Sequence, residues 1–381
     1  MIELSLYISS IFILYLSSFL INFILPLYLE AIGYAPLLIG FLVGILGIVR
    51  VPLSPTAGLI ADIIGRRITL VLGSVFSSLG IMLLLLKDFS VLILGRVLVG
   101  FFGVFLVPIA WALVSEKASV LGASGRIMAI ANALSAIAGA LAPVVGGYLA
   151  STYGYETVII LSAIFFLSVI TLVGAAPSER RKGHVDTKIR REIISTLRRI
   201  FRYSILLALE WYLLYSYWML FPLYMNNLGY SAEVIGLLMT LESLVYIASQ
   251  PLIGYLIDKY RPRYVLLLTT SSIYGASLAY IPYCRDLLHI ALVLVMIALS
   301  SSTIAPVVFA RVSEVSGDLR AFAMGLLFSG GYLGMTLGTI ISGYLAQESF
   351  YSAYGHLVIP GLIISVIAIS EYVSKAPPKT G

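Results

Sequence analysis

The chain has 381 residues, of which 60% are hydrophobic and 11% are charged, and its formal net charge is +6. A soluble domain carries about a quarter charged residues, so this composition excludes a water-facing surface around a single core and leaves lipid as the main solvent. The apolar segments are continuous runs of about 20 residues rather than alternating ten-residue strands, which excludes a β-barrel and predicts transmembrane helices.

Twelve apolar runs follow one another along the chain. In the first half they lie at 5–29, 36–58, 67–86, 91–115, 126–150 and 156–176, and in the second at 204–225, 232–257, 263–283, 287–312, 320–346 and 353–374. The first run lacks a basic flank and a small-residue cleavage site, which favours a retained helix over a signal peptide. Because only the connection at 177–203 is long, we predict an all-α membrane protein with six-helix bundles at 1–176 and 204–381.

The Lys and Arg residues gather on one side of these runs. With both termini in the cytoplasm, most of the 24 lie in cytoplasmic loops or tails, and only Lys87 and Arg285 lie in outer loops. This bias predicts a multi-pass plasma-membrane protein with both termini cytoplasmic. The bias also accounts for the positive net charge without nucleic acid, and we expect a monomer surrounded by membrane lipids.

The connection at 177–203 is strongly basic. From Val185 onward it also shows apolar residues at helical spacing, namely Ile189, Ile193, Leu197 and Ile200 or Phe201. A solvated connector would account for the charge alone. The spacing favours a basic amphipathic helix that lies on the anionic inner leaflet.

The two halves repeat each other in register. Pro26–Tyr28 recurs as Pro222–Tyr224, and Gly147–Ala150 recurs as Gly343–Ala346, in both cases 196 residues later. Six helices repeated in the same orientation predict two bundles related by a pseudo-two-fold axis along the membrane normal.

Four motifs resemble those of the major facilitator superfamily. Gly58–Arg67, between the second and third helices, resembles the family's loop signature Gly-x-x-x-Asp-Arg-x-Gly-Arg-Arg, and Gly254–Arg261 is its degenerate copy. Arg96–Gly100 resembles the fourth-helix signature, and Ala142–Gly147 resembles the fifth-helix signature of antiporters. The resemblance covers the whole chain and is nearest in motifs to the twelve-helix drug–proton antiporters. It implies a transporter that works by alternating access.

The resemblance also implies a charge network that latches the bundles at the cytoplasmic loops. Its members are Gly58, Asp62, Gly65, Arg66 and Glu116, with the second-half counterparts Asp258, Arg261 and Glu314. Ordinary solvated loop charges are the alternative. Small residues of the fifth and eleventh helices are expected to serve helix packing, namely Pro143, Gly146, Gly147, Gly334 and Gly338. Ile63 and Ala142 depart from the motifs, the first where Arg is frequent and the second where Gly is.

Four ionisable side chains fall within the apolar runs: Arg50, Arg96, Glu210 and Glu242. Charges in the hydrocarbon layer are costly and usually mark pathways or partners. They could neutralise each other as buried pairs. Alternatively Glu242, and second Glu210, would bind and release a proton, with Arg96 tuning that step by its resemblance to the fourth-helix motif.

The family resemblance implies that helices 1, 4, 7 and 10 line a central cavity. The candidate lining residues are Tyr15, Ser18, Asn22, Arg50, Arg96, Trp111, Trp211, Tyr215, Tyr217, Trp218, Met296, Ser300 and Thr303. Aromatic rings with a few hydroxyl groups suit an apolar or aromatic organic molecule, although interhelical packing would use the same rings.

The leading hypothesis is proton-coupled export of apolar or cationic organic compounds. The alternative is a facilitator or symporter for a sugar or an organic anion, which Arg50 and Arg96 would favour if both faced the cavity unpaired. A non-transporting receptor is a third reading. No catalytic constellation, metal-ligand cluster or nucleotide-binding loop occurs in the sequence, so we expect no enzyme activity, cofactor or metal.

Overall fold

The computed structural model describes residues 2–121, 124–173, 189–259, 264–315 and 320–375. The apolar runs fold as helices because lipid offers the backbone no hydrogen-bond partner. The first half contains α1 (Ile2–Ala31), α2 (Pro36–Leu53), α3 (Ala57–Ile64), α4 (Arg66–Met82), η1 (Leu83–Leu86), α5 (Phe89–Val120), α6 (Ser124–Tyr153) and α7 (Tyr155–Val173). The second half contains α8 (Ile189–Asn227), α9 (Ala232–Lys259), α10 (Tyr264–Tyr280), η2 (Ile281–Tyr283), α11 (Leu287–Ser301), α12 (Ile304–Val315), α13 (Arg320–Glu348), α14 (Phe350–Gly355) and α15 (Val358–Lys375).

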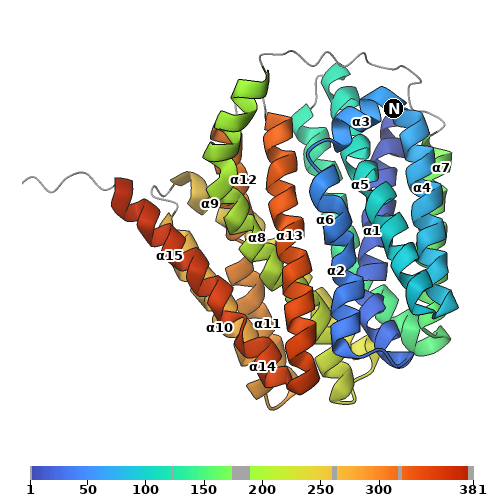
Figure 1. The fold of residues 1–381 in the computed structure, drawn as a ribbon, viewed down its shortest axis with the longest axis vertical. Helices are drawn as coiled ribbons and strands as arrows, with labels where there is room; N and C mark the ends of the chain where they lie inside the picture. The colour runs from blue at the N-terminus through green and yellow to red at the C-terminus, as the bar shows by residue number, and fades with distance from the viewer. Residues whose placement is uncertain (1, 122–123, 174–188, 260–263, 316–319, 376–381) are drawn as a thin grey trace, which may run out of the picture.

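Each half forms one bundle, and the two bundles stand side by side (Figure 1). Ten stretches of the described residues are long and apolar enough to cross a membrane. Together with the shorter α7 and α10 they account for the twelve predicted spans. We call the end at which α1 begins and α15 ends the terminal end, and the opposite end the far end. Across the interface α2 packs on α13, α6 on α9 and α1 on α8.

Two predicted spans are broken near a proline, which cannot donate to the carbonyl four residues earlier. The run 36–58 divides between α2 and α3 at Pro55, and the freed carbonyl of Val51 accepts a hydrogen bond from Ser329 Oγ at 2.8 Å. The run 287–312 divides between α11 and α12 before Pro306, and the freed carbonyl of Ser302 accepts from Gln250 Nε2 at 3.5 Å. Neighbouring helices thus satisfy the backbone where proline interrupts it.

The predicted linker 177–203 is partly an extension of a spanning helix. Residues 189–203 are helical and continuous with the seventh span, as the first part of α8. Arg202, inside the predicted linker, donates to the carbonyl of Ile367 on α15 and contacts the hydroxyl of Ser370. Residues 177–188 and the side chains of 189–199 lie outside the described residues, so the amphipathic surface remains a prediction.

The repeat of 196 residues reappears as repeated geometry. Gly33 and Gly229 both adopt positive φ, 93° and 86°, and each ends the helix before it. Glycine is suited to that conformation because it has no Cβ. Tyr28 donates its hydroxyl to the carbonyl of Leu84 at 2.9 Å, and its counterpart Tyr224 donates to that of Pro282 at 3.3 Å.

The bundle interface repeats in the same register toward the far end. Gly343 packs on the carbonyl of Pro36, and its counterpart Gly147 packs on that of Ala232, which is the equivalent of Pro36. One helical turn further, Gly40 contacts Thr339 while Gly236 contacts Pro143, and these are again equivalent positions. The α2–α13 and α6–α9 contacts are therefore two copies of one contact, related by the pseudo-two-fold axis.

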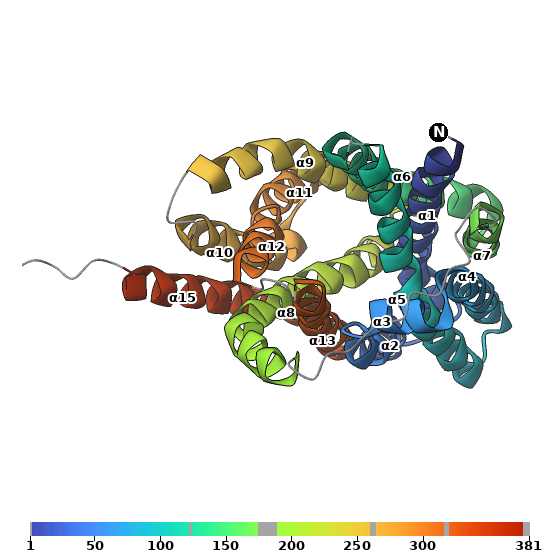
Figure 2. The same ribbon diagram turned by 90° about the horizontal axis from the view of Figure 1, so that it is seen from above.

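Toward the terminal end this symmetry is lost. Along α2 and α13 the contact continues, with Gly325 packed on Pro55. The equivalent positions on α6 and α9 are Ala129 and Pro251, and both are exposed. Seen from the terminal end, α9 runs away from α6 (Figure 2). The bundles are joined at the far end and along α2–α13, and they separate between α6 and α9 at the terminal end.

Candidate substrate site between the bundles

Aromatic side chains of both bundles meet around Arg50, a group that we call the central cluster: Tyr15 on α1, Arg50 on α2, Trp211 and Tyr215 on α8, and Tyr332 on α13. The Trp211 ring lies 5.6 Å from Tyr215 and 5.1 Å from Tyr332, between centroids. Cζ of Arg50 lies 5.5 Å from the centroid of Tyr332. Four of the five were predicted from the sequence, and the structure brings them together at the interface of the bundles.

A second row of rings continues from the central cluster. Trp111 Nε1 donates to the hydroxyl of Tyr15 at 3.4 Å, and the Tyr15 ring lies 6.0 Å from Phe19. Phe19 in turn lies 5.6 Å from Trp218 of the other bundle. Offset and tilted rings at these distances attract one another weakly beyond their area burial. Helices of the two bundles therefore meet here through aromatic surfaces rather than through ion pairs.

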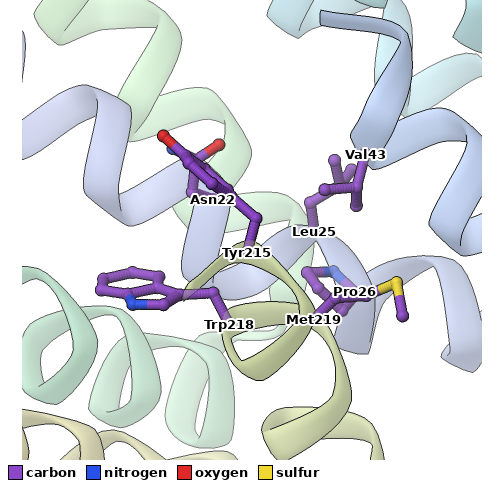
Figure 3. A pocket seen from close by; sticks show the side chains of 7 residues that line it. All are labelled: Asn22, Leu25, Pro26, Val43, Tyr215, Trp218 and Met219. Atoms are coloured by element: carbon purple, nitrogen blue, oxygen red, sulfur yellow. The ribbon is translucent and has the colours of Figure 1, made fainter. Parts of the chain in front are cut away.

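One small pocket opens beside these rings (Figure 3). It is lined by Asn22, Leu25 and Pro26 of α1, Val43 of α2, and Tyr215, Trp218 and Met219 of α8. About 10 Å³ of it is open to the centre of a water molecule, which is room for one water and not for an organic ligand. A substrate at this place would require the bundles to move apart.

The candidates on the tenth helix do not join the cluster. The side chain of Met296 is 49% exposed, and Ser300 Oγ donates to the Met296 carbonyl of its own helix at 2.7 Å. Thr303 shares a hydrogen bond with Thr270 of α10 within the same bundle. Tyr217 is buried among apolar residues, and Ser18 is half-buried. The hydroxyl groups of Ser300 and Thr303 are thus used inside the second bundle.

Arg96 is held inside the first bundle. Its side chain is 1% exposed, and it donates from Nε to the carbonyl of Leu42 at 2.9 Å and from Nη2 to that of Val43 at 3.3 Å. Nη1 is buried and has no hydrogen-bond partner among the described residues. Arg96 therefore ties α5 to the backbone of α2, and it adds a second positive charge near Arg50.

The two membrane carboxylates lie in the second bundle. Glu210 is 5% exposed and Glu242 is 6% exposed. Glu242 accepts a hydrogen bond from Ser243 at 3.4 Å, whereas Oε2 of Glu210 is buried without a partner in the described part of the chain. Tyr246 and Tyr274 each lie near both carboxylates.

Positive and negative membrane charges are therefore segregated by bundle. The described residues contain no ion pair between Arg50 or Arg96 of the first bundle and Glu210 or Glu242 of the second. The structure therefore does not pair the two arginines with the two glutamates, which was one of the two hypotheses for these residues. Each bundle instead carries its own uncompensated charges.

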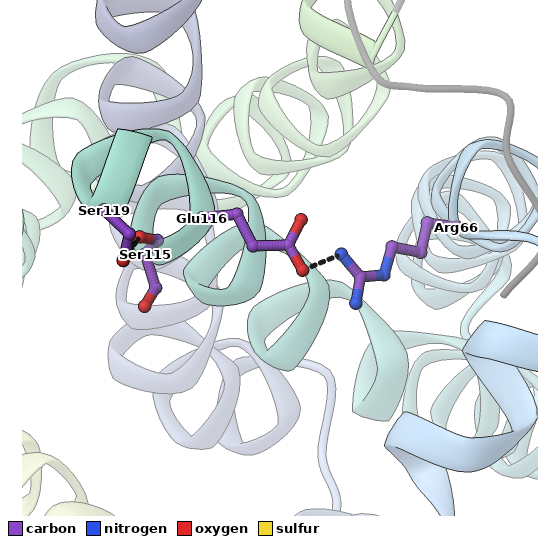
Figure 4. Close-up of polar contacts among 4 residues, drawn as sticks. All are labelled: Arg66, Ser115, Glu116 and Ser119. Carbon is purple, nitrogen blue, oxygen red and sulfur yellow. Dashed lines mark hydrogen bonds and ion pairs between the residues drawn. The ribbon is translucent and has the colours of Figure 1, made fainter. Parts of the chain in front are cut away.

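The loop motif forms an ion pair inside the first bundle. Gly65 adopts a φ of 103° between α3 and α4, which glycine tolerates and other residues rarely adopt. Arg66 Nη1 then reaches Glu116 Oε1 of α5 at 2.8 Å, while Ser119 Oγ donates to the carbonyl of Ser115 along the same helix (Figure 4). In the second bundle Glu314 pairs with Arg311 of its own helix at 2.8 Å.

The remaining members of the predicted latch cannot be assigned contacts. Gly58 and Asp62 lie in α3 and Asp258 lies in α9, but the contacts of these three residues, and all of Arg261, lie outside the described part of the chain. A link between the bundles through these groups stays a prediction.

The predicted packing residues lie at close approaches of helix backbones. Gly334 and Gly338 of α13 pack on the carbonyls of Ala208 and Tyr212 of α8, inside the second bundle. Gly147 and Pro143 of α6 pack on α9 across the interface, and Gly146 packs on Phe23 of α1. A Cβ at most of these glycines would collide with backbone, so the small residues allow the helices to touch.

Sequence reasoning missed three contributors to the interface. Tyr332 and Phe19 were not chosen, the first because the eleventh helix was not among the four assigned to the cavity. Glu30 was also missed: its Oε2 accepts a hydrogen bond from Asn226 Nδ2 at 2.8 Å at the far end. Glu30 and Asn226 are 196 residues apart, so the repeat itself was the signal that could have paired them.

The chain forms two helical bundles that are related by a pseudo-two-fold axis and meet at an aromatic interface. These features define a membrane transporter of the two-bundle class. The family model described as Major Facilitator Superfamily matches residues 7–224 and 203–381. The chain belongs to the Major Facilitator Superfamily.

Relatives and solved structures agree with this assignment. The chain is 25% identical to Multidrug resistance protein 2 of Bacillus subtilis, over 94% of this chain and 93% of that protein. It is 23% identical to the Quinolone resistance protein NorA of Staphylococcus aureus, over 94% of each. A bacterial homolog of the human lysosomal transporter Spinster, solved in an inward-facing and unoccupied conformation, superposes with a TM-score of 0.74 at 15% identity, covering 97% of this chain and 95% of that one. The nucleoside transporter NupG superposes with a TM-score of 0.72 at 15% identity, covering 99% and 100%.

Proposed function

We propose that this transporter exports a small, largely apolar organic compound in exchange for protons. The observation that carries the proposal is the central cluster, because its rings come from both bundles at their interface. A solute that binds there contacts both halves of the protein, so its binding is sensitive to how the bundles are arranged. Relatives named for multidrug and quinolone resistance support organic cargo and export.

Proton coupling is assigned to Glu242 and Glu210. Both carboxyl groups are buried in the second bundle, and neither has a cationic partner among the described residues. Binding a proton removes the cost of burying the negative charge, so proton uptake and release are linked to the hydration of these groups. Separation of the bundles changes that hydration, which provides the coupling.

The position of the carboxylates bears on the choice between apolar and cationic cargo. Glu242 lies near Tyr217 and Tyr274, inside the second bundle, while Arg50 lies within the central cluster, over the Tyr332 ring. An apolar compound would meet no charge penalty at the rings. A cation would have to approach Arg50, so we favour apolar over cationic compounds.

Membrane orientation follows from the basic residues. We place the terminal end, with the linker and the Arg66 loop, in the cytoplasm of the cell and the protein in the plasma membrane. The separation of α6 and α9 then opens toward the cytoplasm, as an exporter requires before it binds its cargo.

Purified protein in liposomes with an imposed pH gradient tests the coupling. Wild-type protein is expected to accumulate a fluorescent apolar aromatic compound only while the gradient lasts. Glu242→Gln should lower gradient-driven transport at least about tenfold, because the charged and neutral forms are no longer interchangeable. Glu348→Gln, which changes an exposed carboxylate at the end of α13, serves as the matched control.

Two outcomes contradict the proposal. Wild-type flux that ignores the gradient would instead fit the facilitator alternative. Gradient-driven transport that survives both Glu242→Gln and Glu210→Gln would remove these residues from the proton pathway.

A further inference from the structure

Arg50 is a guanidinium group without a counter-ion in the membrane interior. Among the described residues it has no ion pair and donates no hydrogen bond, and its Nε is buried without a partner. The electron-rich group that it does contact is the face of Tyr332. A charge in hydrocarbon is normally paired or bonded to backbone carbonyls, as Arg96 is. The positive charge of Arg50 is therefore not compensated by an anionic group among the described residues.

The groups around Arg50 favour an anionic ligand further. Arg96 lies close enough to add a second positive charge, and its own donors are partly spent on Leu42 and Val43. Glu210 is near the Tyr215 side of the cluster but forms no ion pair with Arg50. Arg50 and Arg96 thus bring two positive charges near the central cluster, and neither is paired with a carboxylate among the described residues.

None of the Arg50 donors is used within the described residues: Nε is buried without a partner, and Nη2 lies beside Gly103 of α5. A guanidinium that lies against a ring can still donate from its N–H groups to a planar oxyanion. The Tyr215 phenol and the Tyr332 ring lie near Arg50, and neither tyrosine hydroxyl makes a hydrogen bond within the described residues. The guanidinium of Arg50 and the two phenol groups can thus donate hydrogen bonds to the same oxyanion.

Gly103 supplies the room for this arrangement. A Cβ on Gly103 of α5 would lie 3.1 Å from Nη2 of Arg50. That separation is tighter than ordinary contact, so a side chain at position 103 would require the guanidinium to shift slightly. The backbone of α5 is shaped to let Arg50 reach the interface.

We propose that Arg50, with Tyr215 and Tyr332, forms a subsite for a carboxylate group on an aromatic cargo molecule. The inference rests on the proposed function for the location of the cargo, and it narrows the cargo from apolar compounds to aromatic acids. The rings of Trp211, Tyr215 and Tyr332 bind the aromatic body, and the Arg50 fork binds both carboxylate oxygens. The subsite spans the interface, since Arg50 belongs to the first bundle and the tyrosines to the second.

Binding to protein in nanodiscs tests the subsite without any pH gradient. The discs contain only phosphatidylcholine, and the probes are 2-naphthoate and the neutral 2-naphthylmethanol, followed by equilibrium dialysis. Wild-type protein should prefer naphthoate. Arg50→Gln should weaken naphthoate at least about tenfold, the scale of a lost charge-assisted pair, and change naphthylmethanol less than about twofold. Arg126→Gln, at an exposed arginine on α6, should change neither.

Two further variants separate binding from folding. Gly103→Ala keeps the charge but displaces it, so it should weaken naphthoate selectively. Arg50→Lys keeps a point charge without the fork and should retain part of the preference. An equal loss of both probes in Arg50→Gln and Gly103→Ala, or no preference for naphthoate in the wild type, would overturn the subsite.

A lipid phosphate could satisfy the same guanidinium. The binding series is therefore repeated in discs that contain phosphatidylglycerol. Unchanged naphthoate affinity supports a cargo subsite. Loss of naphthoate binding in these discs, in wild type but not in Arg50→Gln, would assign the site to a lipid headgroup and overturn the proposal.

Glu242→Gln should bind naphthoate normally, so a failure of proton coupling is distinguished from a failure of the subsite.

Discussion

At the residue scale, several groups are used in ways that follow from a single chemical fact about them. Pro55 has no N–H, so the carbonyl of Val51 lacks its helical partner. Ser329 of the other bundle donates its hydroxyl to this carbonyl instead. The guanidinium of Arg96 cannot be hydrated in hydrocarbon, so it donates hydrogen bonds to the carbonyls of α2. These contacts determine which helices pack together, which hydropathy alone does not predict.

Cys284 offers a residue-scale test of orientation. It is the one cysteine in the chain and follows η2 at the far end, outside the spans. Burial, and next the charge of Asp286, raise the pKa of its thiol to about 11. Only the thiolate reacts with maleimides, so labelling should be slow at pH 7 and quicken about tenfold per pH unit up to pH 9.

The measurement uses a membrane-impermeant maleimide on right-side-out and inverted vesicles. We expect modification from the extracellular side only, with Cys284→Ser as the blank. Asp286→Asn should accelerate labelling, since it removes a negative charge that disfavours the thiolate. Modification confined to inverted vesicles would reverse the proposed orientation.

At the scale of helices, sequence periodicity and composition were sufficient for most of the fold. Continuous apolar runs have to be helices in lipid, so α1, α5, α6, α9 and α13 begin and end close to their predicted bounds. The predictions were wrong where local chemistry intervened. Pro55 and Pro306 divided two runs. The helix predicted in the basic connection is present from Ile189, but it is continuous with the seventh span, because the helix extends beyond the apolar run.

The structure brings together only part of the predicted set of cavity residues, for a related reason. Helical spacing on single helices grouped Tyr15 with Asn22 and Trp211 with Tyr215, and the structure places them at one interface. Spacing cannot show which face of a helix meets which neighbour. Tyr332 was therefore missed, and Thr303, grouped with the cavity, bonds Thr270 within its own bundle.

Close packing of α13 on α8 yields a prediction at this scale. A Cβ on Gly334 would collide with the backbone carbonyl of Ala208, which cannot move away without displacing α8. Gly334→Ala should therefore lower the free energy of unfolding by about 1–3 kcal/mol, the usual cost of overpacking. Thermal unfolding in detergent measures it.

Gly254 of α9 provides the matched control, because a Cβ there would meet nothing within 4 Å. Gly254→Ala should keep or slightly raise the melting temperature, since alanine favours the helix. Equal melting temperatures for Gly334→Ala and Gly254→Ala would show that the close approach of α8 and α13 does not depend on the glycine.

At the scale of the whole molecule, the repeat explains both the symmetry and its loss. The α2–α13 and α6–α9 contacts are equivalent toward the far end and differ toward the terminal end, where Gly325 meets Pro55 but Ala129 and Pro251 are exposed. Two halves that share equivalent contacts can exchange such arrangements at small cost, because each contact has an equivalent alternative. Alternating access then requires that the far end open when α6 and α9 close.

The Glu30–Asn226 hydrogen bond is one of the contacts between the bundles that oppose this opening. Its two members are equivalent in the repeat, so a direct bond between them lies at the pseudo-two-fold axis. An axial contact is broken by any separation of the bundles at the far end. Hydrogen bonds to a charged acceptor contribute about 1.5–3 kcal/mol, enough to shift a two-state population about tenfold or more.

Asn226→Leu should therefore raise the population that is open at the far end. Spin labels at Ala35 and Ser231, which are exposed and equivalent in the repeat, report the separation in a Cys284→Ser background. We expect double electron–electron resonance to show a longer-distance population that is minor in the parent protein. Asn227→Leu changes an exposed neighbour and should leave the distribution unaltered. If Asn226→Leu also leaves it unaltered, the axial hydrogen bond does not set the balance between the two states. The closure of the far end then rests on the other contacts between the bundles, among them the glycine contacts and the hydrogen bond from Glu233 N–H to Ser151 Oγ.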